Sequence, residues 1–67
     1  MKINTNMVEI LLAKSKMSKS NLAISAGISR QNVSTILGRR TCRPETAERI
    51  AHALGVPIEQ IMEEGDG

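Results

Sequence analysis

Side chains able to recognise a nucleic acid are concentrated in the middle of the chain. They are Ser29, Arg30, Gln31, Asn32 and Thr35. Guanidinium, amide and hydroxyl groups are the donors and acceptors that contact base edges and phosphate oxygens. Apolar residues of the same stretch recur so that they fall on the other side of two short helices: Leu22, Ala23, Ala26, Ile28, Val33 and Ile36. This periodicity predicts a helix pair with one buried face and one polar face.

Positive charge is concentrated in the same part of the chain. No acidic residue lies between Glu9 and Glu45, and seven basic residues occupy that window: Lys14, Lys16, Lys19, Arg30, Arg39, Arg40 and Arg43. The charged residues after Pro44 are mostly acidic, and Arg49 is the only arginine or lysine among them. Because the formal net charge is only +2, the uneven distribution indicates a polyanionic partner more strongly than the sum does.

Composition excludes several classes of protein. A chain of 67 residues forms one small domain, and without Phe, Tyr or Trp its core must be aliphatic. Modules that stack single-stranded bases on aromatic rings are therefore disfavoured. The lone Cys42 cannot form an internal disulfide, and neither Cys42 nor His52 has a second ligand at metal-binding spacing. We expect no metal, no cofactor and no small-molecule ligand.

No nucleophile, base and orienting group can be assembled from the sequence, so we expect no enzymatic activity. The longest apolar run, residues 10–13, is far too short for a membrane span, and we expect no membrane partner. Cysteine usage indicates a reducing compartment, which predicts a cytoplasmic protein.

Five helices are needed to position the polar residues. The first is predicted to begin at an Asn6 cap, with Glu9 completing a capping box, and to bury Met7, Ile10 and Leu11. The predicted ranges are about 6–16, 18–27, 29–37, 44–55 and 57–62.

Serine, glycine and proline set the expected boundaries of these helices. Ser18 and Ser29 are predicted caps, and Pro44 suits the first turn of the fourth helix. Gly27, Gly38 and Gly55 are predicted stops. The expected architecture is a compact all-α single domain over residues 1–67, with its central motif at about residues 19–38 and a frayed tail at about residues 63–67.

Small and apolar residues also follow a fixed order: Leu22, Ala23, Ala26, Gly27, Ile28, Ser29, Val33, Ser34, Ile36, Pro44 and residues 50–56. This order resembles the phage repressor and Cro family of helix-turn-helix proteins (lambda-repressor-like, XRE family) over roughly residues 7–62. The resemblance implies a five-helix DNA-binding domain whose third helix, about residues 29–37, reads the major groove. The implied function is sequence-specific regulation of transcription, with repression at an operator as the leading hypothesis.

The resemblance also assigns roles to residues. It places base contacts at Ser29, Arg30, Gln31 and Thr35. The chemistry of the helix start and of the cations predicts phosphate contacts at Ser18, Lys19, Asn32, Arg39, Arg40 and Arg43. The implied partner is double-stranded DNA with a palindromic operator, bound by a homodimer that meets at Val56, Pro57 and Ile58. The family often has glycine where this chain has Lys16, which predicts a strained turn there.

Two alternatives remain open from the sequence. One is the antitoxin of a toxin–antitoxin pair that regulates its own gene through the same fold. The other is a helical module that binds a protein instead of DNA, although a basic polar helix face disfavours it.

Overall fold

The computed structural model of the chain describes residues 1–63 and is all-helical. Its elements are α1 (Thr5–Ser15), α2 (Lys19–Ala26), α3 (Arg30–Arg39), α4 (Pro44–Leu54) and the 3-10 helix η1 (Ile58–Gln60). The last short helix predicted over about residues 57–62 is found only as one 3-10 turn, so the count of five helices is not confirmed. Most of the tail predicted to fray lies outside the described residues. None of the helices in the described part has the length and apolarity needed to cross a membrane.

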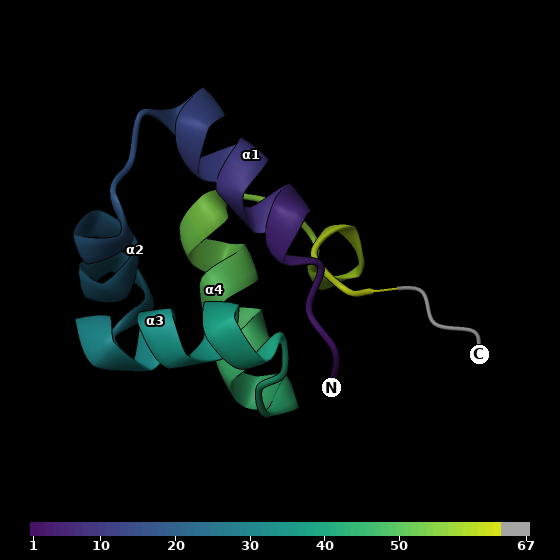
Figure 1. Cartoon of the computed structure of the whole chain (residues 1–67). Coiled ribbons are helices and arrows are strands. Elements are labelled where there is room, and N and C mark those ends of the chain that lie inside the picture. The colour runs from purple at the N-terminus through teal and green to yellow at the C-terminus, as the bar shows by residue number, and fades with distance from the viewer. Residues whose placement is uncertain (64–67) are drawn as a thin grey trace.

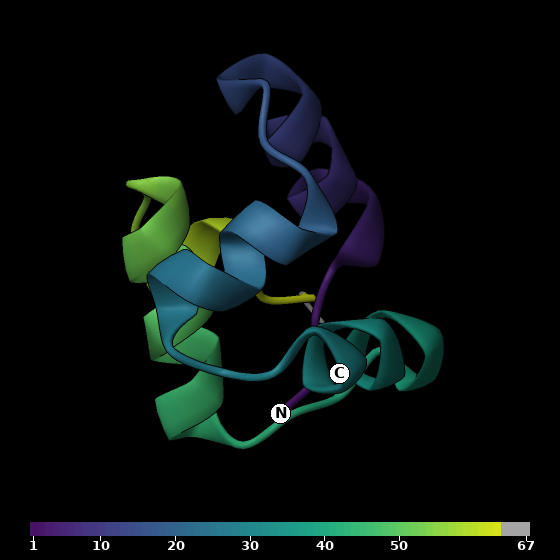
Figure 2. The same cartoon turned by 90° about the vertical axis from the view of Figure 1, so that its left-hand side faces the viewer.

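The central element is α4, which packs against α1, α2 and η1, while α2 packs against α3 (Figure 1). In the view turned by 90°, α2 lies beside α4, and α3 extends away from that pair (Figure 2). The Cα radius of gyration is 10.5 Å, close to the roughly 11 Å expected for a compact chain of this length. This arrangement places α3 at the edge of the domain, with one side of the helix packed against the core and the opposite side exposed.

The core is aliphatic throughout. Its buried residues are Ile3, Val8, Leu11, Leu12, Leu22, Ala23, Ala26, Val33, Ile36, Ala47, Ile50, Ala51, Leu54 and Ile61. Among residues 1–63 no polar or charged residue is buried, and no buried side-chain nitrogen or oxygen lacks a partner. The apolar stripe predicted for the helix pair is confirmed, except that Ile28 is only partly buried at its edge.

Residues 1–4 form a strap that joins two distant parts of the chain. Four backbone hydrogen bonds hold it: Ile3 N–H to Arg40 O at 2.9 Å, Asn4 N–H to Ile61 O at 2.8 Å, Cys42 N–H to Met1 O at 3.0 Å, and Glu63 N–H to Lys2 O at 3.1 Å. Ile3, at 1% exposure, fills the core beneath the strap. Isolated β-bridges pair Lys2 with Thr41 and Ile3 with Met62, although no strand forms within residues 1–63.

The first helix begins earlier than the sequence indicated. Its cap is Asn4 and not Asn6, and the Met7 amide donates to Asn4 Oδ1 at 3.1 Å. Asn4 is favoured because Ile3 before it and Val8 after it are both buried, which is the hydrophobic-staple arrangement. The buried face holds Val8, and Ile10 is 49% exposed, so the predicted inner position of Ile10 is wrong.

Gly27 makes the turn between α2 and α3. Its φ of 73° is left-handed, and its amide donates to the carbonyls of Ala23 and Ile24. A Cβ built at Gly27 would lie 3.6 Å from an Arg49 guanidinium nitrogen, so α4 also closes over this turn. Glycine adopts this conformation without steric cost, and the predicted helix stop at Gly27 is confirmed.

The third helix runs past its predicted end. Gly38 lies inside α3, and the helix is closed by Arg40 with a left-handed φ of 63°. The Arg40 amide donates to Ile36 O at 2.7 Å, and its carbonyl accepts from Ile3. The strap therefore sets the end of α3, which explains why the prediction of a stop at Gly38 is wrong.

Lys16 closes α1 in the left-handed conformation, with φ 55° and ψ 39°. Its amide donates to the carbonyls of Ala13 and Leu12, as in other helix C-caps of this kind. A residue with a Cβ is strained here by roughly 1–2 kcal/mol. The strained turn expected at Lys16 is confirmed.

Replacing Lys16 with glycine is expected to stabilise the domain. Relief of the left-handed strain exceeds the entropy that glycine adds to the unfolded chain, so Lys16→Gly should raise the free energy of unfolding by about 0.5–1 kcal/mol. The matched control is Lys14→Gly, which removes the same charge from the helical last turn of α1 and should lower it by about as much. Urea unfolding would measure both, and two changes of the same sign would contradict this account.

The strap predicts that two isoleucines near the N-terminus contribute very differently to the free energy of unfolding. Ile3→Ala should lower the free energy of unfolding by about 2–4 kcal/mol because it leaves a cavity in the core. Ile10→Ala removes the same atoms from an exposed site and should change it by less than about 0.5 kcal/mol. Thermal unfolding followed by circular dichroism separates them, and equal losses would show that the strap is not part of the core.

Candidate nucleic-acid interface

The free side of α3 is formed by residues opposite its buried side. Val33 and Ile36 are 1% and 8% exposed and anchor the helix in the core. Gln31 and Thr35 are exposed, and with Gly38 they recur at i, i+4 and i+7 on the face opposite those anchors. We call this row of Gln31, Thr35 and Gly38 the outer row of α3.

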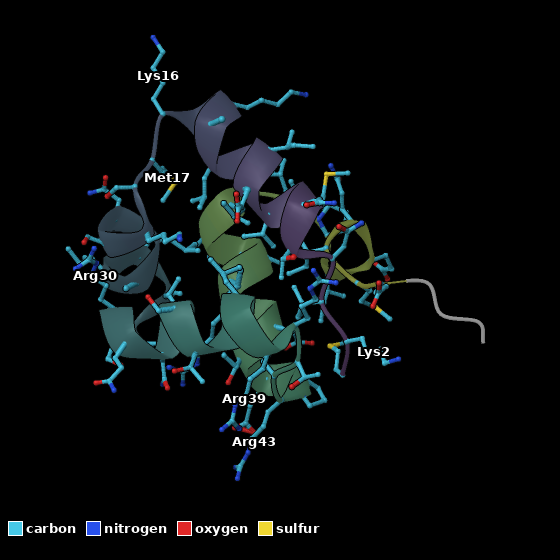
Figure 3. All side chains as sticks on the ribbon, viewed as in Figure 1. Lys2, Lys16, Met17, Arg30, Arg39 and Arg43 are labelled. Carbon is cyan, nitrogen blue, oxygen red and sulfur yellow. The ribbon has the colours of Figure 1, made fainter. Side chains whose placement is uncertain are left out.

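The other two predicted base-contacting residues lie at the start of α3. Ser29 is the N-cap, and its hydroxyl oxygen accepts from the Asn32 amide at 3.0 Å. Arg30 is exposed, and its side chain extends from the first turn of α3 beside α2, far from Arg39 at the other end (Figure 3). Arg30 therefore lies to the side of the outer row. The cap uses one of the two acceptor lone pairs of the Ser29 hydroxyl, which leaves its proton and the second lone pair for other contacts.

The start of α2 is a closed capping box. The Asn21 amide donates to Ser18 Oγ at 3.1 Å, and the Ser18 amide donates to Asn21 Oδ1 at 3.1 Å. This box confirms the cap predicted at Ser18 and uses the amide of the third helical position. The first two amides, from Lys19 and Ser20, have no partner inside a helix and remain suited to an anion. The exposed Lys19 side chain adds positive charge beside them.

A basic connector, residues 39–43, links α3 to α4. Arg39 ends α3, Arg40 is its left-handed cap, and Arg43 caps α4 without a side-chain hydrogen bond. All three arginines are exposed. Figure 3 shows Arg39 and Arg43 extending from the same end of the molecule, below α3. The strap fixes this connector through its bonds to Arg40 and Cys42, so the cations are carried by an ordered segment.

The acid-free window is not one surface. Lys16 lies at the far end of α1, at the opposite end of the molecule from Arg39 and Arg43 (Figure 3). Proximity in sequence therefore overstated the basic patch, because Lys16 is separated in space from Arg39 and Arg43 although all three belong to the same window of the sequence. Lys2 is brought to the connector by its bridge with Thr41. No local sequence pattern links Lys2 with Thr41, so the position of Lys2 beside the connector was not predicted from the sequence.

Two of the three predicted dimer residues, Val56 and Pro57, lie between α4 and η1, and Ile58 begins η1. Val56 and Ile58 are partly buried and pack against the core, whereas Pro57 is exposed. Val56 and Ile58 also line an open groove of about 580 Å³ whose other lining residues come from α2 and α4: Ser25, Ala26, Glu45, Glu48, Arg49, Ala51 and His52. None of the predicted base- or phosphate-contacting residues lines this groove.

Cys42 and His52 lie on different elements, Cys42 in the connector and His52 on α4. Burial raises the pKa of the Cys42 thiol, and a smaller attraction from the nearby N-terminus opposes that rise. The basic loop around Cys42 thus does not lower the pKa of its thiol. His52 is exposed on α4. Within the described range, no three histidine, cysteine, aspartate or glutamate residues are grouped so that they could hold a metal ion.

Comparison with known proteins places this geometry in a family. The family model of the Cro/C1-type HTH DNA-binding domain matches residues 7–64. Neither the comparison with curated proteins nor the comparison with solved structures yields a match. The match covers most of the chain, including all of α2, the Gly27 turn and α3. The chain therefore belongs to the family of Cro/C1-type helix-turn-helix DNA-binding domains.

Proposed function

We propose that this DNA-binding protein is a sequence-specific transcriptional repressor that reads the major groove with α3. The observation that carries the proposal is the two-sided character of α3. Val33 and Ile36 fix the helix in the core, and the opposite face presents exposed Gln31 and Thr35. A helix held in this way fits into the major groove, where each base pair offers a distinct set of donors and acceptors.

The outer row and its flanks suit direct contacts with bases. The Gln31 amide can pair with two atoms of adenine, and Thr35 can contact a thymine methyl group. Arg30, beside the row, can donate two hydrogen bonds to guanine if its side chain swings toward the groove. Ser29 is the weaker candidate, because the helix cap already uses one of the two lone pairs of its hydroxyl oxygen. Each bidentate contact would discriminate against a wrong base by about 1–3 kcal/mol.

Contacts to phosphates would hold the helix in register. The amides at the start of α2, next to Ser18 and Lys19, suit one phosphate, and Asn32 on the edge of α3 suits another. At the other end of α3, the exposed Arg39, Arg40 and Arg43 would grip the backbone. Because these candidate phosphate contacts lie near both ends of α3, they would fix the orientation of the helix in the groove better than a single cluster of cations would. Occupying an operator is sufficient for repression, since it blocks access to a promoter.

A dimer is the second part of the proposal. The ten residues of α3 extend over only about 15 Å, whereas successive major grooves on one side of DNA lie roughly 34 Å apart. One copy therefore reads one half-site, and two copies read a palindrome. Pro57 is exposed beside the partly buried Val56 and Ile58, which supports a symmetric contact there.

The dependence of binding on salt and two substitutions test the proposed base contacts and phosphate contacts. Fluorescence anisotropy with a duplex selected from random sequence should show an affinity that falls roughly 100-fold between about 50 and about 200 mM salt, if about four phosphates are neutralised. Gln31→Ala should weaken the selected duplex by about 1–3 kcal/mol and leave random duplex nearly unchanged. Arg43→Ala should weaken both duplexes and reduce the logarithmic salt slope by about 1.

Lys16→Gly is the matched control for charge, because it removes one positive charge at the end of the molecule opposite Arg43. It should bind both duplexes as the wild type does. An equal loss for Gln31→Ala on both duplexes would mean that the outer row of α3 does not read bases. Failure of the wild type to bind any duplex at low salt would refute the proposed function.

The dimer is tested on the selected site itself. Sedimentation of the complex should give two chains on a palindromic duplex and one chain when either half is scrambled. The scrambled duplex should also bind at least about tenfold more weakly, because the contact between copies is lost. Selection of an unrepeated site that carries a single chain would contradict the dimer.

A further inference from the structure

Gly38 occupies a position where nothing in the protein requires glycine. It lies inside α3, one residue before the last helical residue, Arg39. The glycines of the described chain with positive φ are Gly27 and Gly55, so Gly38 has a conformation that any residue adopts. Glycine within a helix destabilises it relative to alanine, because the unfolded chain gains conformational freedom.

Packing does not explain Gly38 either. A Cβ built at this position meets no heavy atom within 4 Å, outside its neighbours and its own helix backbone. At Gly27, by contrast, a guanidinium group of Arg49 lies 3.6 Å from the built Cβ. The space beside Gly38 is therefore open in the free protein, and the missing side chain serves no contact within residues 1–63.

The location of this open space is specific. Gly38 continues the outer row of Gln31 and Thr35, on the face opposite Val33 and Ile36. It is also next to Arg39, at the start of the basic connector. Gly38 thus lies between the face of α3 that is proposed to contact bases and the arginines that are proposed to bind phosphates.

We propose that Gly38 is a site of close approach, where the sugar–phosphate backbone of the bound duplex packs directly against the backbone of α3. This inference rests on the proposed function and adds a residue that positions α3 in the groove. Glycine suits such a site because it lets another backbone come closer than any side chain allows. Gly38 makes no base contact, so it affects affinity for every sequence through the depth of docking.

The test is the variant Gly38→Ala. Free of DNA it should be more stable than the wild type, with a melting temperature higher by roughly 4–8 °C for a domain of this size. Its affinity for the selected duplex and for random duplex should fall by about 10- to 100-fold, the loss expected when a methyl group is forced into a filled contact. Gly38→Val should bind still more weakly. Wild-type affinity of the more stable Gly38→Ala protein would overturn the inference.

Two comparisons make the outcome unambiguous. Lys16→Gly is also expected to stabilise the protein, so its unchanged DNA affinity would show that greater stability alone does not weaken binding. Wild-type binding to the same duplexes tests the proposed function separately. If the wild type binds and Gly38→Ala binds equally well, only the close approach at Gly38 is wrong; if the wild type binds no duplex, the proposed function fails first.

Discussion

The structure depends on sealing a small core with aliphatic side chains alone. A chain of 67 residues without an aromatic ring has little apolar surface to bury, and small domains are correspondingly marginal. The chain meets this constraint by using both of its ends: Ile3 and Ile61 are 1% and 0% exposed, as fully buried as Leu22 in α2. Because Val33 belongs to the same core, the orientation of α3 follows from the closure of the whole domain.

Features set by a few neighbouring residues were predictable from the sequence. The caps at Ser18 and Ser29, the turn at Gly27 and the start of α4 at Pro44 all follow from local chemistry, and all are found. The start of α1 was not predictable in this way, because an asparagine can cap a helix at either position 4 or position 6, and the choice of Asn4 depends on burying Ile3. The apolar run at residues 10–13 likewise has no unique inner face until the partners of the helix are known.

In the candidate interface, too, features set by neighbouring residues were predictable and features set by distant contacts were not. Helical periodicity correctly separated the exposed Gln31 and Thr35 from the buried Val33 and Ile36. It did not give the end of α3, because that end is fixed by a hydrogen bond between Ile3 and Arg40, residues far apart in sequence. Charge in sequence was also a poor guide to charge in space, since α1 carries Lys16 to the opposite end of the molecule from the connector (Figure 3). The roles assigned to individual side chains in DNA contact stay predictions.

The strap has a consequence for how the domain folds. Helical domains usually fold through contacts between near neighbours in sequence, which makes them fast. Here the carbonyl of Ile61 and the amide of Glu63 must meet residues at the start of the chain, so the entropy of closing nearly the full length has to be overcome. The connector that carries Arg40 is held by two other bonds, from Ile3 N–H to Arg40 O and from Cys42 N–H to Met1 O, which close a shorter loop. The arginine-bearing edge therefore depends on the N-terminal strap, whereas closure of the whole domain depends on residues from both of its ends.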